Sequence, residues 1–327
     1  LHYPLRRQRQ MCIRDSHHAD IPNRIQARDV AHPGTWIAAV IVTMLALVFV
    51  QGLVTNPNYQ WPVVWLYLRD VKVITGIGYT IVLTFAAMLL GTAVALLMAM
   101  MRQSRNPVLR GVSRAYIFVF RGVPVYTQLV FWGLLAVLYP TLSIGVPFSG
   151  PQLASIETKK VVTALAAAII GLGLNEGAYL AEIIRSGLES VDAGQSEAAK
   201  ALGMKPSLIM RRVIIPQAMR VIIPPLGNET IGMLKTTSLV LAVPFTLDLQ
   251  YATSAIANRI YAPIPLLIVA AFWYLVVTSV LMIGQHFLKH YFGRGFNGQS
   301  SSKRLHRQAA IQAAGTTHKN IALEVEQ

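Results

Sequence analysis

Charged residues are scarce in this chain of 327 residues, at 13% of the total, whereas a soluble globular protein carries about a quarter. Three long windows contain no Asp, Glu, Lys or Arg at all: residues 73–101, 122–156 and 260–288. A helix of about 20 apolar residues crosses the roughly 30 Å hydrocarbon core of a bilayer, and each window is long enough. The sequence therefore argues against a soluble protein and predicts an all-α protein that crosses the membrane several times.

Metal, redox and catalytic motifs are also lacking. Cys12 is the single cysteine, so no internal disulfide can form. His286 and His290 are four residues apart but have no third ligand nearby, so we interpret them as interfacial side chains, not a metal site. No phosphate-binding GxxxxGK[ST] loop, HExxH motif, Ser/His set or pair of catalytic carboxylates appears at suggestive spacing. We expect no enzyme activity and no cofactor bound by this chain.

Six apolar segments are predicted to span the membrane: residues 36–54, 76–101, 123–142, 161–180, 226–247 and 264–287. Of the 29 Lys and Arg residues, 23 fall before the first span, in loops 102–121 and 185–220, or after the last span. Five fall in the alternate loops, and Lys235 lies inside a span. Basic residues favour the cytoplasmic side, so both termini and loop 185–220 are predicted to lie in the cytoplasm. The net charge of +15 is thus explained by membrane orientation, with no nucleic-acid partner.

Loop 185–220 is patterned like a folded element. Residues 196–202 are strong helix formers, Gly203 breaks that helix, and Pro206 suits the first turn of a second one. We expect Pro216 to end the second helix. The result is a bent helix pair with small side chains at Ala198 and Ala199 and a charge at Glu197. From the residues alone, docking into a partner protein and lying along the inner leaflet are equally good interpretations.

The same loop resembles the EAA loop of ABC importer permeases. The resemblance rests on Glu197-Ala198-Ala199, then Gly203 after three residues, then, after nine more, Val213-Ile214-Ile215-Pro216. The family pattern has Ile and Leu where this chain has Val213 and Ile215. Further segments resemble the polar amino acid subfamily (histidine, glutamine, arginine and opine type). They are Phe120-Arg121-Gly122-Val123-Pro124 with Gln128, Gly177-Ala178-Tyr179-Leu180-Ala181-Glu182, and Lys235-Thr236-Thr237-Ser238-Leu239.

This resemblance implies a type I ABC importer transmembrane-domain fold and the permease function in a bacterial inner membrane. It implies that Glu197, Ala198, Ala199, Gly203 and Pro216 couple the chain to a separate ATPase that binds and hydrolyses ATP. It also implies a second permease copy or a sister permease, and an extracytoplasmic solute-binding protein. Members often have five spans, so the first span here is additional.

The resemblance covers about residues 76–292, which sets the expected organisation. Residues 1–35 form a cytoplasmic segment in which Leu1 to Ser16, basic and patternless, are interpreted as foreign to the native protein. Residues 36–75 add the first helix and an external loop. The permease domain follows at 76–292, with the EAA loop at 189–220, and the tail 293–327 is expected to be disordered.

Three ionisable residues fall in or near the spans: Glu176, Glu229 and Lys235. Charges at membrane depth tend to face a cavity or one another, and a zwitterionic amino acid would need both signs along its path. The three residues are therefore possible parts of the substrate path, although an interfacial or structural role explains them as well. Glu229 and Lys235 are six residues apart, about 240° around a helix, so they should not pair. Arg121 is better explained by cytoplasmic anchoring than by gating.

An ion-coupled secondary carrier of small polar solutes is the alternative function. Such carriers often show related halves and broken helices with charges at the midplane. This sequence shows no convincing internal repeat, and an EAA elbow has no purpose without an ATPase. The sequence does not identify the solute or distinguish a homodimer from a heterodimer.

Overall fold

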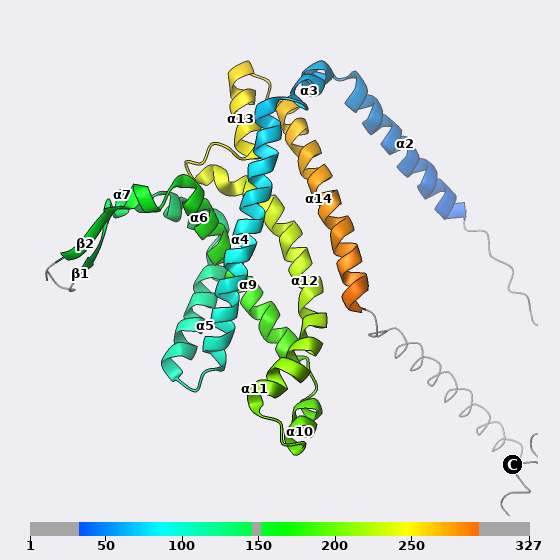
Figure 1. The fold of residues 1–327 in the computed structure, drawn as a ribbon. Helices are drawn as coiled ribbons and strands as arrows, with labels where there is room; N and C mark the ends of the chain where they lie inside the picture. Colours follow the sequence, from blue (N-terminus) through cyan, green and yellow to red (C-terminus); the bar gives the residue numbers. More distant parts are fainter. Residues whose placement is uncertain (1–32, 146–151, 294–327) are drawn as a thin grey trace, which may run out of the picture. The chain divides into compact units, whose positions relative to one another are not determined.

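The computed structural model describes residues 33–145 and 152–293 (Figure 1). The chain forms two compact units, residues 1–57 and 58–327. Helix α2 (Pro33–Thr55) belongs to the first unit; it is 23 residues long and carries no charged residue. The interpretation of Leu1 to Ser16 as foreign lies outside the described residues, and so does the tail expected to be disordered, 293–327, apart from Gly293, which ends α14.

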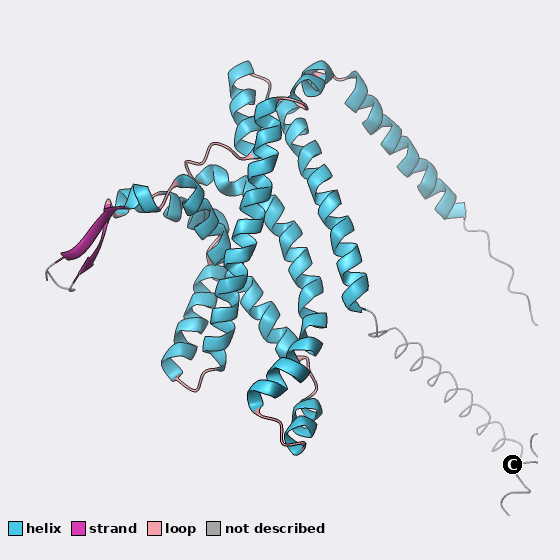
Figure 2. Cartoon of the chain, in the orientation of Figure 1, coloured by secondary structure: helices cyan, strands magenta, loops and turns pink. Residues whose placement is uncertain are grey.

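Helices account for nearly all of the described chain (Figure 2). The elements after α2 are η1 (Pro57–Tyr59), α3 (Trp61–Tyr67), α4 (Val71–Gln103), α5 (Pro107–Gly122), α6 (Val125–Gly133), α7 (Leu135–Leu138), β1 (Thr141–Gly145), β2 (Gln152–Glu157), α8 (Thr158–Val161), α9 (Ala164–Glu189), α10 (Ala193–Ala201), α11 (Pro206–Ile209), η2 (Met210–Ile214), α12 (Ile215–Thr236), η3 (Thr237–Ala242), α13 (Leu249–Ile260) and α14 (Pro263–Gly293).

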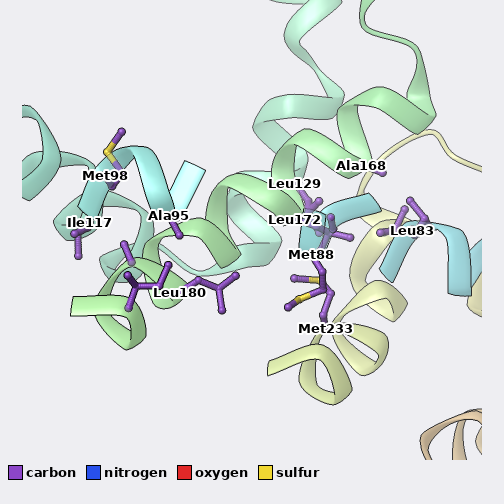
Figure 3. Packing of buried hydrophobic residues seen from close by; sticks show 14 of the residues in the cluster. Leu83, Met88, Ala95, Met98, Ile117, Leu129, Ala168, Leu172, Leu180 and Met233 are labelled. Carbon is purple, nitrogen blue, oxygen red and sulfur yellow. The ribbon is translucent and has the colours of Figure 1, made fainter. Parts of the chain in front are cut away.

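Helices α4 and α9 pack closely along their length and form the centre of the second unit. Their contact depends on glycine: a Cβ added to Gly173 would lie 2.8 Å from Leu90 Cδ2, and one added to Gly91 would lie 3.1 Å from the Gly173 carbonyl oxygen. Figure 3 shows the apolar cluster around this contact, with Met88 of α4 and Leu172 of α9 among its members. Because lipid supplies no hydrophobic drive between helices, such small-residue contacts are what hold membrane helices together.

The expected third span, residues 123–142, is wrong as a single helix. Its helical part is divided into α6 and α7, and β1 follows them. Pro124 has no N–H to donate to the carbonyl of Phe120, so α5 ends at Gly122 and α6 starts at Val125. The loop expected at 102–121 is instead the helix α5, which packs against α4 and α9. Asn106 caps it by accepting a hydrogen bond from the backbone N–H of Val108 at 2.9 Å.

The helix expected to stop at Pro216 continues instead. Backbone angles stay right-handed helical from α11 through the π-helical turn η2 into α12, with Pro216 in the first turn of α12. The amide of Ile215 bonds to the carbonyl of Met210, five residues back, and this wider turn immediately precedes the proline. The fifth expected span, 226–247, therefore overlaps the end of a longer helical run, 206–242, which is followed by a turn at 243–244.

Two features have no counterpart in the sequence analysis. Strands β1 and β2 pair as an antiparallel hairpin, with Thr141 opposite Glu157. The short helix α13 packs with α3 and α14 around a second apolar cluster that includes Leu249, Ile256 and Leu266. In Figure 1, α13 lies at one end of the second unit and α10 and α11 lie at the other.

Four described helices are long and apolar enough to cross a membrane, at residues 34–55, 71–103, 164–189 and 263–292. They coincide with the first, second, fourth and sixth expected spans. The third expected span is divided into α6, α7 and β1, and the fifth overlaps the end of the longer helical run 206–242.

Candidate functional site

A cavity of about 410 Å³ lies among the α5–α6 junction, α9 and α12. Both acidic residues nominated within spans, Glu176 of α9 and Glu229 of α12, line it. The other lining residues are Arg121, Gly122, Val123, Pro124, Val125, Asn175, Tyr179, Gly232, Met233 and Thr236. Polar and charged side chains therefore meet where the chain breaks between α5 and α6.

The helix break at Pro124 is stabilised by side-chain amides. The carbonyl of Phe120 accepts hydrogen bonds from Asn175 Nδ2 at 2.9 Å and from Gln128 Nε2 at 2.9 Å. Gln128 Nε2 also donates to the carbonyl of Val123 at 2.8 Å. Backbone groups freed at membrane depth must find partners inside the protein, and these two amides supply them. They therefore fix the α5–α6 junction against α9 and shape one wall of the cavity.

Glu176 is the most buried charged side chain of the cavity, with 5% of its surface exposed. Its Oε1 has no hydrogen-bond partner among the described residues. Glu229 of α12 lines the same cavity as Glu176 of α9. Two carboxyl groups that face one space, one of them with an unpaired oxygen, form a site that a cation could complete.

Arg121 lies on the cavity wall, whereas the sequence favoured a cytoplasmic anchor over a gating role. Its guanidinium carbon is 5.2 Å from the centre of the Tyr179 ring, within range of a cation–π interaction. Both side chains are exposed. The cavity therefore offers a positive group beside its carboxyl groups.

Lys235 does not line this cavity, although it was nominated with the two acids. It is exposed in the last turn of α12 and makes no ion pair among the described residues, with Glu229 or with any other acid. Sequence reasoning missed Asn175, Tyr179 and Thr236 as lining residues. Tyr179 stood within a recognised motif, but no sequence signal linked Asn175 to Phe120, 55 positions away.

The expected elbow is present between α10 and α11. Gly203 has φ of +73°, and it is the only glycine of the described chain with positive φ. The amide of Gly203 donates to the carbonyl of Lys200 at 2.9 Å, and that of Met204 to Ala199 at 3.2 Å. This pair of bonds is the Schellman motif, which ends α10 and fixes the bend.

The exposed surface of the elbow differs in part from the expected one. Glu197 and Ala198 are exposed, but Ala199 is buried, with 5% of its surface exposed, so it cannot form the docking surface. Leu202 is 82% exposed at the end of α10. Gln217 Nε2 of α12 donates to Gln195 Oε1 of α10 at 3.4 Å. An exposed apolar side chain and an exposed carboxylate on one short helix, which is joined to a long helix by the Gln217–Gln195 hydrogen bond, suit insertion into a partner protein.

Among residues 33–145 and 152–293, no group of three or more His, Cys, Asp or Glu residues is placed to hold a metal ion.

Comparison with known proteins places this architecture in a family. Residues 91–291 match the family described as "Binding-protein-dependent transport system inner membrane component". A solved structure described as an amino acid ABC transporter with histidines is 34% identical, with a TM-score of 0.55, and covers 67% of this chain and 94% of its own. The predicted helical permease fold is confirmed by these two matches.

Two relatives extend the match. The arginine transport system permease protein ArgU of Corynebacterium glutamicum is 45% identical over 305 residues, which is 93% of this chain and 94% of that protein. The probable amino-acid ABC transporter permease protein YckA of Bacillus subtilis is 33% identical over 233 residues, 69% of this chain and 94% of that protein. Because the first match leaves only 7% of this chain outside, it includes α2.

Proposed function

Because this chain belongs to the family of inner membrane components of binding-protein-dependent transport systems and is the permease subunit of an ABC importer of amino acids, we propose that its solute is a cationic amino acid, with arginine as the first to test. The observation that carries the solute class is the cavity that holds both Glu176 and Glu229. The 45% identity to an arginine permease supports the same choice.

The cavity chemistry suits an amino acid with a positive side chain. Two carboxylates can accept hydrogen bonds from an ammonium or guanidinium group, and guanidinium–carboxylate pairs are among the stronger ones. Arg121 offers a cation for the α-carboxylate of the solute. The exposed side chain of Lys235 lies outside the cavity of the single chain. Lys235 is therefore proposed as a path residue of the assembled pore only.

Coupling to a separate ATPase is proposed to occur through Glu197, Ala198, Ala199, Gly203 and Pro216. The helical run 206–242 starts at the elbow and carries Glu229 and Thr236 of the cavity. From Pro206 to Glu229 this run is about 35 Å long. A displacement of the elbow by a nucleotide-driven partner would therefore move one cavity wall. Ala199 supports the elbow from within, and Leu202 adds contact area beside Glu197.

The partners proposed are an ABC ATPase, an extracytoplasmic solute-binding protein, and a second copy of this chain or a sister permease that completes the pore. Residues 76–292 would form the transporting domain with the elbow inside 189–220. Residues 36–75 would add a helix and an external loop, and residues 1–35 and 293–327 would form the cytoplasmic ends.

The test is uptake by the complex reconstituted in proteoliposomes with its ATPase and binding protein. Glu176→Gln and Glu229→Gln should each lower ATP-dependent arginine uptake by tenfold to a hundredfold, on the order of one charged hydrogen bond. Glu157→Gln is the matched control, because Glu157 lies on the exposed hairpin and, within the described residues, pairs with Lys160 alone at 3.4 Å. Unchanged uptake in both cavity variants would refute the site. Uptake that followed a proton gradient without ATP would refute the importer.

A further inference from the structure

Two adjoining cavities lie beside the elbow, away from the proposed solute site. The first, of about 390 Å³, is lined by four arginines, Arg102, Arg110, Arg114 and Arg185, together with Glu189 and a few other residues. The second, of about 570 Å³, is lined almost entirely by apolar side chains of α4, α9 and α12. They share Ala99, Gln103, Leu188 and Met210, so the basic cavity opens onto the apolar groove.

The basic cavity holds more positive than negative charge. Glu182 pairs with Arg102 and, at 2.7 Å, with Arg185, which also pairs with Glu189 at 2.5 Å. Glu189 is the one acidic residue that lines this cavity with the four arginines, and the ion pairs of Glu182 and Glu189 involve only Arg102 and Arg185. Arg110 and Arg114 form no ion pair within the described residues, and both are exposed.

The two unpaired arginines are arranged to act together. They are four residues apart on α5, so they lie on one face of the helix. Arginine binds phosphate with two parallel hydrogen bonds, which makes such a pair suited to a phosphate group. The Glu182 network leaves this pair free while it holds Arg102 and Arg185 in place.

The apolar groove has the length of one membrane leaflet. Along α4 it extends from Gln103 to Thr92, a rise of about 16 Å. Half of a bilayer hydrocarbon core is about 15 Å thick. Leu96, Met100 and Met219 on its walls are 49%, 64% and 37% exposed. The groove is therefore open at its side to whatever surrounds the helices, and basic residues stand at one end only.

We propose that these cavities bind one anionic glycerophospholipid of the cytoplasmic leaflet. Its phosphate would lie against Arg110 and Arg114, and an acyl chain would fill the groove between α4 and α12. Basic pockets between helices on the cytoplasmic side are the usual form of such sites. The proposal rests on the proposed orientation of the chain, with the elbow in the cytoplasm, but it is independent of the solute carried.

The lipid would contact the joint between the elbow and α12. Met210 lines both cavities, and Ile214 lines the basic one; both belong to the π-helical turn η2. An occupied groove would support this turn, through which the elbow is connected to Glu229. Substitutions that release the lipid should therefore lower lipid retention and should also weaken the dependence of ATP hydrolysis on solute.

Lipid retention by the full chain is the direct test. The purified permease is equilibrated in mixed nanodiscs of phosphatidylglycerol and phosphatidylcholine, and retained lipids are measured by native mass spectrometry. We expect selective retention of phosphatidylglycerol. Arg110→Gln with Arg114→Gln should weaken it on the order of 30-fold, the combined effect of two arginine contacts. Arg105→Gln is the control, because Arg105 precedes α5 and does not line the cavity.

Two further arms exclude other occupants. Inorganic phosphate and soluble glycerophosphate should not displace the retained lipid; displacement by either at millimolar concentration would identify a simple anion site and overturn the proposal. Met100→Cys in a Cys12→Ser background should form no disulfide between copies; efficient crosslinking would identify the groove as an interface. Equal retention of both lipids, or retention unaffected by the double substitution, would also overturn it. Retention is measured without solute or nucleotide, so failure of transport does not affect this result.

Discussion

At the scale of single residues, Asp248 shows how a buried acid can serve structure. It caps α13, and its Oδ2 accepts hydrogen bonds from the amides of Gln250 at 2.9 Å and Tyr251 at 3.2 Å. Its side chain is fully buried, and Oδ1 has no partner in the described chain. Burial raises the pKa of this carboxyl, although the backbone bonds oppose the shift.

The first prediction follows from this balance. Asp248→Ala removes the cap and should lower the free energy of unfolding by about 0.5–2 kcal/mol, whereas Asp248→Asn keeps the cap and should stay close to the unaltered protein. Because the folded pKa is raised, the stability from this carboxyl is greatest at low pH and declines as pH rises from its unfolded towards its folded pKa. Asp248→Asn should remove that pH dependence. Thermal unfolding in detergent at several pH values measures both effects, and equal loss in the two variants would contradict the capping role.

At the scale of elements, the elbow depends on a backbone conformation. A side chain at Gly203 has open space around it, but φ of +73° is unfavourable for it. Gly203→Ala should therefore cost about 1–2 kcal/mol in the bent form. Gly203→Asn should cost less, since Asn tolerates this region. The readout is ATP hydrolysis stimulated by solute and binding protein, which should fall in the order Gly, Asn, Ala. A rigid-elbow role is contradicted if Ala and Gly behave alike.

The packing of α9 on α12 also depends on one glycine. A Cβ on Gly187 would overlap Ile222 Cγ1, so Gly187→Ala should destabilise the protein by about 1–3 kcal/mol. Ile222→Ala in the same chain should relieve part of the loss, which a double-mutant cycle measures. Gly78→Ala is the control, because no atom lies within 4 Å of its added Cβ. Additive effects of the two substitutions would show that these helices do not meet there.

Sequence signals differed in how well they predicted these elements. The bend at Gly203 was predictable because its cause is local: a run of strong helix formers is followed by glycine. Asn106 and Pro107 mark the start of α5 equally clearly, whereas the five arginines of residues 102–121 indicate membrane orientation and carry no information on helix formation. The prediction that Pro216 ends a helix is wrong because a proline that ends one helix and a proline in the first turn of the next look alike in sequence. Only the π turn before it distinguishes them.

The site could be predicted only in its two acidic residues, because Arg121 was expected to be an anchor and Lys235 does not line the cavity. Glu176 and Glu229 are visible as acids in apolar surroundings, so sequence nominates them readily. Asn175 and Gln128 act by reaching the freed carbonyl of Phe120, and Tyr179 acts by its place under Arg121. These roles depend on how α5, α6 and α9 meet. No periodicity within one segment contains that information.

At the scale of the whole molecule, the two ends of the second unit are predicted to lie on opposite sides of the membrane. Helix α9 separates them; its 26 residues extend about 39 Å, more than the hydrocarbon core. Lys159 precedes it beside the hairpin, and Glu197 follows it in α10; both side chains are exposed. Basic residues are in excess in the segments at the elbow end, 102–121 and 185–220, and this excess predicts that the elbow end is cytoplasmic.

Labelling of single cysteines in intact cells tests this arrangement. In a Cys12→Ser background, Lys159→Cys should react with a membrane-impermeant maleimide added outside, after permeabilisation of any outer barrier. Glu197→Cys should react only once the inner membrane is opened. The pair is matched in exposure, and α9 lies between the two positions, so it distinguishes orientation from reactivity. External labelling of Glu197→Cys would move the elbow out of reach of any cytoplasmic ATPase and would refute coupling through it, while leaving the helical fold intact.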